Sequence, residues 1–256
     1  MRFALLGSGS RGNATLIQSG RTCVMVDCGF SATETTARLA RLKIAPEDIS
    51  AILITHEHSD HVNGVARFAS RYDIPIRCTS GTLAGCAKYA LEAVETFDPQ
   101  LEFELGDLGV KPLTVPHDAR EPTQFILTDG RHRLGILTDT GSITDHIRLS
   151  LSGCDALILE CNHDGELLEN GPYPEQLKAR IGGPLGHLSN AQAAGLLEVL
   201  DCGGLQHLVA AHLSEKNNSP QLACEALAQA LHCELDWIEH ATQETGLGWR
   251  DILTGG

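Results

Sequence analysis

Positively charged residues are scarce in this chain of 256 residues. Lysine and arginine together number 19, against 33 aspartate and glutamate residues, and the formal net charge is −14. Proteins that bind long stretches of nucleic acid usually carry a basic surface, so this composition argues against an extended electrostatic footprint. A small binding site for nucleic acid is still compatible with the composition. Charges more than about 8 Å apart are largely screened at physiological salt, so a local positive site can still bind an anion.

Long apolar segments and paired cysteine motifs are also missing. No apolar run approaches the roughly 20 residues that a helix needs to cross a bilayer. The first residues, MRFALLGSGS, lack the length and the cleavage site of a secretory signal. The nine cysteines are odd in number and form no CxxC pair, which favours reduced thiols over a disulfide framework. We therefore expect a cytoplasmic protein without a membrane partner.

Strand and helix patterns alternate along the chain. The expected strands are residues 2–6, 14–19, 22–27, 51–55, 103–105, 110–116, 123–129, 132–139, 155–160, 207–212 and 234–240. The expected helices are residues 31–43, 60–72, 189–201 and 219–232. Asp129 and Gly130 separate two of the strands, a strong hairpin signal. The pattern predicts one domain over residues 1–256, in which two sheets are faced by helices.

The segment ITHEHSDHVNG carries four potential metal ligands within six residues: His56, His58, Asp60 and His61. His56 and His58 stand two apart in extended chain, so their side chains point the same way. Asp60 and His61 follow where the chain turns into a helix, and they can face a second point in space. Imidazole and carboxylate bind zinc, so the segment predicts two metals side by side. A lone histidine is more often structural, but that interpretation does not suit four ligands at one turn.

Three further candidate ligands each end an expected strand. His117 ends VKPLTVPH, Asp139 ends RLGILTD and His212 ends HLVAAH. Taken singly, each is weak evidence, and His117 alone is as often structural as functional. Their shared placement is typical of sites in sheet proteins, because rigid strands direct residues to one edge.

The order of these motifs resembles the metallo-β-lactamase superfamily: HxHxDH, a lone histidine, an aspartate and a final histidine. The earlier VDCG, with Asp27, resembles its first motif. The resemblance implies an α+β fold, a four-layer αββα sandwich. It assigns the ligands in three sets: His56, His58 and His117 to one metal, Asp60, His61 and His212 to the other, and Asp139 bridging both. Asp27 would be structural, orienting the ligand loop as a hydrogen-bond acceptor.

A narrower resemblance is to the YycJ-like, or WalJ-like, group of bacterial nucleases. It rests on GSGSRGNAT, HEHSDHVNG, PHDAREP, LTDTG, ECNHD, GHLSN and HLSEKNN. It implies a cytoplasmic, metal-dependent exonuclease that acts on DNA from the 5′ end. GHLSN and AHLS also resemble the corresponding region of ribonuclease Z, which implies His187 as the general acid and His212 as a metal ligand.

The chain departs from other branches of the superfamily. The bridging position is Asp139 where many true β-lactamases have cysteine. The second ligand is His58 where flavodiiron proteins have glutamate, which favours hydrolysis over redox chemistry. No long insertion separates Asp139 from His212, so the extra domain of the β-CASP nucleases is not expected, and no Gly/Pro-rich arm for gripping tRNA is evident. A redox or non-catalytic module would more often show broken ligands.

The predicted reaction is hydrolysis of a phosphodiester by a hydroxide that bridges two divalent metal ions. Zinc is favoured and manganese is an alternative. Two divalent ions, two aspartates and one hydroxide leave a charge of roughly +1, which attracts an anionic diester. Asp60 and His187 are the predicted catalytic residues, and the unperturbed pKa of a histidine, about 6.5, lets His187 carry a proton near neutral pH.

Substrate contacts are expected from four polar residues near the site motifs: Arg120, His163, Lys216 and Asn218. Each is about as often a surface or supporting residue. The Gly-Ser run at 7–10 lacks the Lys-Ser/Thr of a phosphate loop, so it predicts a tight turn beside the cleft. The expected substrate is nucleic acid, with DNA favoured over RNA. The sequence does not indicate the oligomeric state. The alternative is a small-molecule hydrolase of the same fold, acting on a cyclic phosphodiester, ester or thioester, which the net charge favours.

Overall fold

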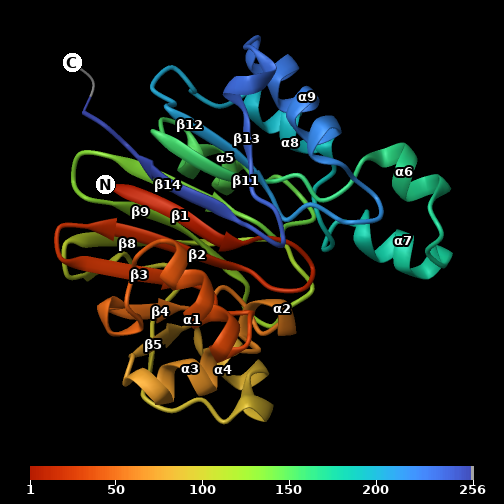
Figure 1. Ribbon diagram of the computed structural model, residues 1–256. Coiled ribbons are helices and arrows are strands. Elements are labelled where there is room, and N and C mark those ends of the chain that lie inside the picture. The colour runs from red at the N-terminus through yellow and green to blue at the C-terminus, as the bar shows by residue number, and fades with distance from the viewer. Residues whose placement is uncertain (255–256) are drawn as a thin grey trace.

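A seven-stranded mixed sheet is formed mainly by the N-terminal part of the chain (Figure 1). The computed structural model describes residues 1–254. The strand order is β14 (Leu247–Asp251), β1 (Arg2–Gly7), β2 (Ala14–Ser19), β3 (Thr22–Val26), β4 (Ala51–Leu53), β5 (Ile76–Cys78) and β6 (Val94–Thr96). Strands β3 to β6 are parallel and the other pairs are antiparallel. The carboxyl ends of β3 and β4 therefore lie at the same edge.

A second seven-stranded mixed sheet follows. Its order is β13 (Glu239–His240), β12 (His207–Ala211), β11 (Ala156–Glu160), β10 (Arg133–Leu137), β9 (Thr123–Thr128), β8 (Leu108–Thr114) and β7 (Phe103–Leu105). Strands β10 to β13 are parallel, while β7 to β10 pair in antiparallel fashion. Three parallel strands, β10, β11 and β12, thus end at one edge of this sheet.

The two sheets pack face to face through alternate residues of their strands. Phe3 and Leu5 of β1 share one buried cluster with Phe125 and Leu127 of β9. Successive side chains of a strand point to opposite faces, so Leu6 belongs instead to the cluster on the outer face of the first sheet. The apolar core between the sheets holds the strand ends of both sheets in fixed positions.

Helices cover the outer face of each sheet. Apolar residues of α1 (Ala32–Arg41) and α3 (Val65–Tyr72) join the cluster outside the first sheet. Those of α5 (Asp145–Leu151), α8 (Asn190–Leu197) and α9 (Pro220–Leu231) join the cluster outside the second. The layers are therefore helix, sheet, sheet and helix, and the expected αββα sandwich is confirmed.

Four further helices are short: α2 (Ser59–Val62), α4 (Ser80–Gly85), α6 (Gly165–Asn170) and α7 (Glu175–Ile181). Figure 1 shows α6 and α7 projecting at one side of the sandwich. Three 3₁₀ helices, Pro46–Asp48, Ala87–Tyr89 and Leu235–Trp237, complete the helical elements. Within residues 1–254, no helix has the length and apolar character needed to cross a membrane.

Several expected elements differ in the structure. The strand expected at 234–240 is a 3₁₀ helix over Leu235–Trp237 followed by only two strand residues, because Leu235 and Trp237 find no sheet face to cover and stay partly exposed. The helix expected at 60–72 is divided, since Gly64 separates α2 from α3. The helix expected at 189–201 ends at Leu197. Strands β5, β6 and β14 and helices α4 to α7 were not predicted.

Candidate metal centre

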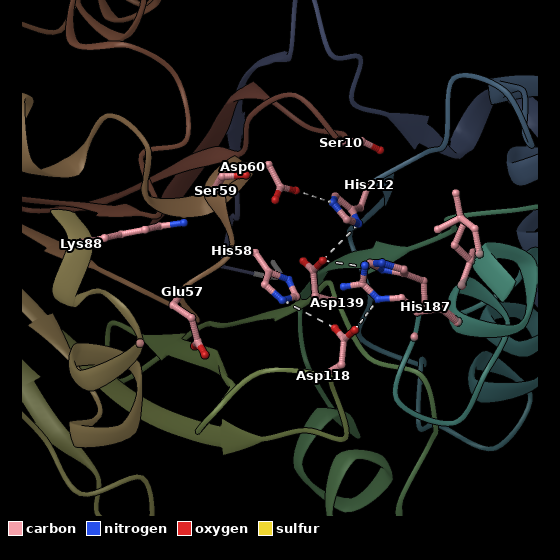
Figure 2. Close-up of a pocket in the computed structure, with 15 residues that line it drawn as sticks. Ser10, Glu57, His58, Ser59, Asp60, Lys88, Asp118, Asp139, His187 and His212 are labelled. Atoms are coloured by element: carbon pink, nitrogen blue, oxygen red, sulfur yellow. Dashed lines mark hydrogen bonds and ion pairs between the residues drawn. The ribbon is translucent and has the colours of Figure 1, made fainter. Parts of the chain in front are cut away.

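Seven residues from both sheets meet at one edge of the sandwich. They follow strands β4, β8, β10 and β12 or lie in the short helix α2, and they are His56, His58, Asp60, His61, His117, Asp139 and His212. Figure 2 shows His58, Asp60, Asp139 and His212 around one cleft. The structure thus brings together all seven residues that the sequence predicts as metal ligands.

Three histidines form the first potential metal site. Ligand atoms of His56, His58 and His117 lie within 4.8 Å of one another. Nδ1 of His58 is 3.3 Å from Nε2 of His117, and His56 has no exposed surface. Three imidazoles that leave a position open are typical of a zinc site in a hydrolase.

Asp60, His61 and His212 form the second potential site. Oδ2 of Asp60 lies 3.4 Å from Nε2 of His61 and 3.5 Å from Nε2 of His212. Asp139 stands between the two sites, because its Oδ2 is 3.3 Å from Nε2 of His61 and it forms a further potential site with His56 and His61. A carboxylate in this place has two oxygens to share between two ions.

Asp27 fixes the orientation of two of these rings. Its carboxylate accepts hydrogen bonds from the backbone amide and hydroxyl of Thr55 and lies 2.7 Å from Nδ1 of His61. The Thr55 hydroxyl is also 3.0 Å from Nδ1 of His56. With the Nδ1 protons directed to these oxygens, Nε2 of each ring faces the potential metal sites. Nε2 of His56 has no partner within residues 1–254, and Nε2 of His61 lies 3.2 Å from the side-chain amide of Asn13.

The Nδ1 atoms of His117 and His212 have acceptors as well. Nδ1 of His117 lies 3.0 Å from the backbone oxygen of Gly186, and Nδ1 of His212 lies 3.0 Å from Oε1 of Glu160. Four ligand rings are therefore held by an oxygen on the side away from the potential metal.

Unpartnered buried atoms provide a test of whether this set suits a metal. Nε2 of His56, Nε2 of His212 and Oδ2 of Asp139 are buried and have no hydrogen-bond partner within residues 1–254. Leaving such atoms unsatisfied costs about 1–3 kcal/mol each. All three belong to the potential metal sites, where coordination would satisfy them, so the donor set fits two divalent ions.

The protonation of the ligand histidines differs from one ring to the next. Burial holds the pKa of His56 well below 6.5, so this imidazole is neutral, the form that binds metal. Burial also lowers the pKa of His212, but the nearby carboxylates of Asp139, Asp60 and Glu160 raise it to about 10. A metal bound at the second site would therefore displace a proton from His212.

Two residues near the ligand loop were missed by the sequence analysis. The amide of Asn13 donates to the backbone oxygen of Asp60 at 2.8 Å, and its side chain lies 3.3 Å from Oδ2 of Asp60. Gly29 packs so closely that an added Cβ would lie 1.8 Å from the same backbone oxygen. Both belong to motifs quoted for the family resemblance, GSGSRGNAT and VDCG, but their contacts with a loop some 30 to 50 residues away cannot be derived from spacing.

His187 lies beside the second site and is paired with a buried carboxylate. Nδ1 of His187 is 2.8 Å from Oε1 of Glu160, the same oxygen that His212 contacts. Ser189 caps helix α8 and thereby fixes the segment that carries His187. Burial lowers the pKa of His187, but the charge and hydrogen bond of Glu160 raise it above its usual value. Glu160 was not predicted, although it opens the ECNHD motif.

The predicted substrate-binding residues lie elsewhere. Arg120 and Lys216 are exposed and outside the cleft, and the ammonium of Lys216 lies over the ring of Tyr173. Asn218 uses its amide group on Cys161 and Asn190, so this group is not free for a phosphate. The proximity of these three residues to the motifs in sequence did not place them in the cleft.

His163 is buried behind the site and also does not line the cleft. Its backbone oxygen accepts from Asn190, and burial lowers the pKa of its imidazole. These contacts favour a supporting position over substrate contact. Of the Gly-Ser run at 7–10, Ser10 lines the cleft, and the hydroxyl of Ser8 accepts from the amide of His212 at 2.8 Å.

The cleft over the metal centre has a volume of about 560 Å³. It is lined by Ser10, Glu57, His58, Ser59, Asp60, Gly85, Lys88, Asp118, Asp139, Leu177, Arg180, Ile181, Gly186, His187 and His212. Pockets of this size accept ligands as large as a nucleotide. Its walls come from the ligand loop, from the 3₁₀ helix Ala87–Tyr89 and from α7.

Three residues of the centre have left-handed backbone. Asp27, Asp139 and His212 have φ of 60°, 54° and 55° and each directly follows, or lies two residues beyond, the end of a strand. This region is sparsely populated by residues other than glycine, and aspartate and histidine are among those that enter it most readily. Such conformations are typical of functional sites held by the surrounding fold.

Comparison with known proteins agrees with this geometry. Residues 22–213 match the β-lactamase superfamily domain. The exodeoxyribonuclease YycJ of Bacillus anthracis is 33% identical over 90% of this chain and 89% of its own length. The exodeoxyribonuclease WalJ of Streptococcus pneumoniae is 34% identical over 87% of this chain and 85% of its own. The crystal structure of YhfI from Bacillus subtilis, a metallo-β-lactamase fold protein, superposes with a TM-score of 0.75 at 18% identity, covering 98% of this chain and 99% of YhfI. The chain therefore belongs to the β-lactamase superfamily, in the group that includes YycJ and WalJ.

Proposed function

We propose that this chain is a dinuclear metal-dependent phosphodiesterase, a 5′ DNA exonuclease, formed by one domain over residues 1–256. The family places it among metal-dependent hydrolases. The observation that carries the finer proposal is the pairing of His187 with the buried Glu160 beside Asp139. A proton donor next to a two-metal ligand set is what cleavage of a phosphodiester requires.

The two metals would be held by the seven ligands described above, with Asp139 shared. Zinc suits this histidine-rich set, and manganese is the alternative. When bound, such ions lower the pKa of water to about 7 and bind phosphate oxygens. Asp60 supplies a carboxylate that stays ionised, since burial raises its pKa but the charges and bonds of His61 and His212 lower it strongly.

His187 would protonate the leaving oxygen. Its Nδ1 proton is directed to Glu160, which leaves Nε2 as the atom able to give a proton to a group in the cleft. The raised pKa of His187 keeps more of it protonated near neutral pH. Glu160 therefore acts as a positioning residue that also stabilises the imidazolium.

The substrate assignment rests on the relatives. YycJ and WalJ are both named exodeoxyribonucleases and are similar to this chain over most of its length. By that similarity we propose DNA as substrate, cleaved from the 5′ end, and a cytoplasmic location, in which the nine free cysteines would remain reduced.

Hydrolysis by zinc-loaded and manganese-loaded protein tests the proposal. The substrates are 5′-labelled single- and double-stranded DNA, RNA and bis(p-nitrophenyl) phosphate. Stepwise release of nucleotides from the 5′ end of DNA is expected. Turnover of the small diester alone would contradict the exonuclease assignment and favour the small-molecule hydrolase, which the four carboxylates lining the cleft also suit.

Replacing Asp139 by alanine tests the bridging ligand. Asp139→Ala should lose bound metal, because one carboxylate serves both sites. Asp236→Ala, on the exposed 3₁₀ helix, is the matched control and should retain it. Unchanged metal content of Asp139→Ala, measured by elemental analysis, would remove Asp139 from the ligand set.

A further inference from the structure

Only two lysine or arginine side chains line the cleft within residues 1–254, Lys88 and Arg180. We propose that they bind the backbone phosphates on either side of the cleaved one, so that a single DNA strand crosses the metal centre from the 3₁₀ helix Ala87–Tyr89 to helix α7. This inference rests on the proposed function and extends it, since it assigns substrate contacts that the sequence placed elsewhere.

Lys88 reaches the centre from one wall. It is exposed on the 3₁₀ helix, and Figure 2 shows its side chain extending towards Ser59 and Asp60. Its ammonium lies 4.9 Å from the centroid of the Tyr89 ring, and no ion pair within residues 1–254 includes it. An unpaired ammonium beside a site of this kind is available to a phosphate.

Arg180 lies on the opposite wall. Its Nε donates to Oδ2 of Asp118 at 2.6 Å, and Figure 2 places Asp118 and Lys88 on opposite sides of His58. The Arg180 side chain is 61% exposed. Arginine has five N–H donors, so the bond through Nε fixes the guanidinium while both amino groups remain free for a phosphate.

The wall that carries Arg180 also offers apolar contact. Leu177 and Ile181 lie one turn apart on α7, are half-buried and line the same cleft. A sugar or base attached to the phosphate at Arg180 would cover them. An inorganic anion has no such apolar part, which is why the arrangement suits a nucleotide chain.

Charge makes both cations necessary. The cleft also contains the carboxylates of Glu57 and Asp118, which would repel phosphates that flank the metal centre. With a formal net charge of −14, the rest of the protein supplies no attraction. Lys88 and Arg180 offset these carboxylates at the two places where the strand enters and leaves.

Binding of an uncleaved strand tests the path. The probe is a short fluorescein-labelled DNA single strand with phosphorothioate linkages, added to metal-loaded protein, and anisotropy gives Kd over a range of salt concentration. Each phosphate contact on a single strand contributes about 0.7 to the slope of log Kd against log salt. Lys88→Gln and Arg180→Gln should each lower the slope by about that amount, and the double variant by about twice as much.

Matched controls separate this effect from a general loss of charge. Lys43→Gln and Arg148→Gln each remove one positive charge from exposed or partly exposed surface outside the cleft and should keep the wild-type slope. Lys88→Arg and Arg180→Lys keep the positive charge and should also keep the wild-type slope. Urea midpoints equal to that of the wild type will show that the variants are folded.

Unchanged slopes for Lys88→Gln and Arg180→Gln would overturn the inference. A fall for only one of them would also overturn it, because the strand would then not cross the cleft. Cleavage is a separate result. If the wild-type protein binds the strand through both residues but cleaves no DNA, the proposed function is contradicted and the path of the strand is not.

Discussion

Replacing Glu160 by glutamine tests whether one buried carboxylate holds both His187 and His212. Glu160 has no exposed surface and accepts four hydrogen bonds. The donors are Nδ1 of His187 at 2.8 Å, Nδ1 of His212 at 3.0 Å, the amide of Thr140 at 3.0 Å and the amide of Leu188 at 3.1 Å. Glutamine keeps one acceptor oxygen, but its NH₂ group only donates. One pair of donors would therefore face another donor.

The histidines lose their acceptor if the glutamine oxygen stays with the fixed backbone amides. A hydrogen bond to a charged group contributes about 1.5–3 kcal/mol, so losing two lowers the free energy of unfolding by about 3 kcal/mol or more. His212 would then move its proton to Nε2, the atom that faces the metal. Loss of such an outer acceptor typically costs about 10–100-fold in metal affinity.

The stability difference should depend on pH. Burial raises the pKa of Glu160, but the charge of His187 and the bonds from His187 and His212 lower it to about 2. A depressed pKa means that the stabilisation is present above the unfolded value, about 4.3. It is lost as pH falls towards the folded value. The gap between wild type and Glu160→Gln should therefore shrink below about pH 4.

Zinc titration against a chromophoric chelator and urea unfolding measure the two effects. Glu166→Gln is the matched control, because Glu166 is exposed on α6 and remote from the metal ligands. Wild-type zinc affinity together with a wild-type urea midpoint in Glu160→Gln would refute the role given to this carboxylate.

Three further changes have defined outcomes. His187→Ala should bind metal as the wild type does but lose about 10²–10⁴-fold in turnover; elemental analysis and rate measurement check this, and wild-type turnover would end its role as general acid. Gly29→Ala places a Cβ 1.8 Å from the Asp60 oxygen and should cost at least about 1–3 kcal/mol, so an unchanged urea midpoint would show that the loop yields freely. The pKa of His207 is raised chiefly by its hydrogen bond with Glu239, and this stabilisation is complete below about 6.5 and lost as pH rises through the raised value. His207→Gln should therefore lower the free energy of unfolding in urea more at about pH 6 than at about pH 9, by no more than about 1 kcal/mol. A difference between variant and wild type that does not depend on pH would contradict the pairing.

Four of the seven candidate ligands could be predicted from sequence because their geometry is local. His56 and His58 share a face of extended chain, and the turn after them redirects Asp60 and His61. Glu160 could not be predicted in this way. It is the last residue of a buried strand. The pairing of β11 with β12 brings it to His212, and backbone hydrogen bonds of Leu188 bring the segment with His187 to it.

The basic residues that line the cleft could not be predicted for a related reason. Arg120 is close in sequence to His117 but points to solvent, whereas Arg180 is 62 residues from its partner Asp118 and reaches it only because α7 folds back over the cleft. The same limit applies to the fold. Strands β5 and β6 have three residues each, too few to show alternation, although β7 has the same length and was predicted. The longer strands β1, β2 and β9 were predicted to within one residue.

The left-handed backbone at Asp27, Asp139 and His212 has a consequence for engineering. Each such residue costs of the order of 1–3 kcal/mol, which the remainder of the sandwich must offset. A library of variants selected for thermal resistance alone would be drawn to these positions, where glycine relieves the backbone. The selected variants would have a higher Tm but bind metal poorly. Any search for a more thermostable variant of this enzyme therefore has to select for metal binding at the same time.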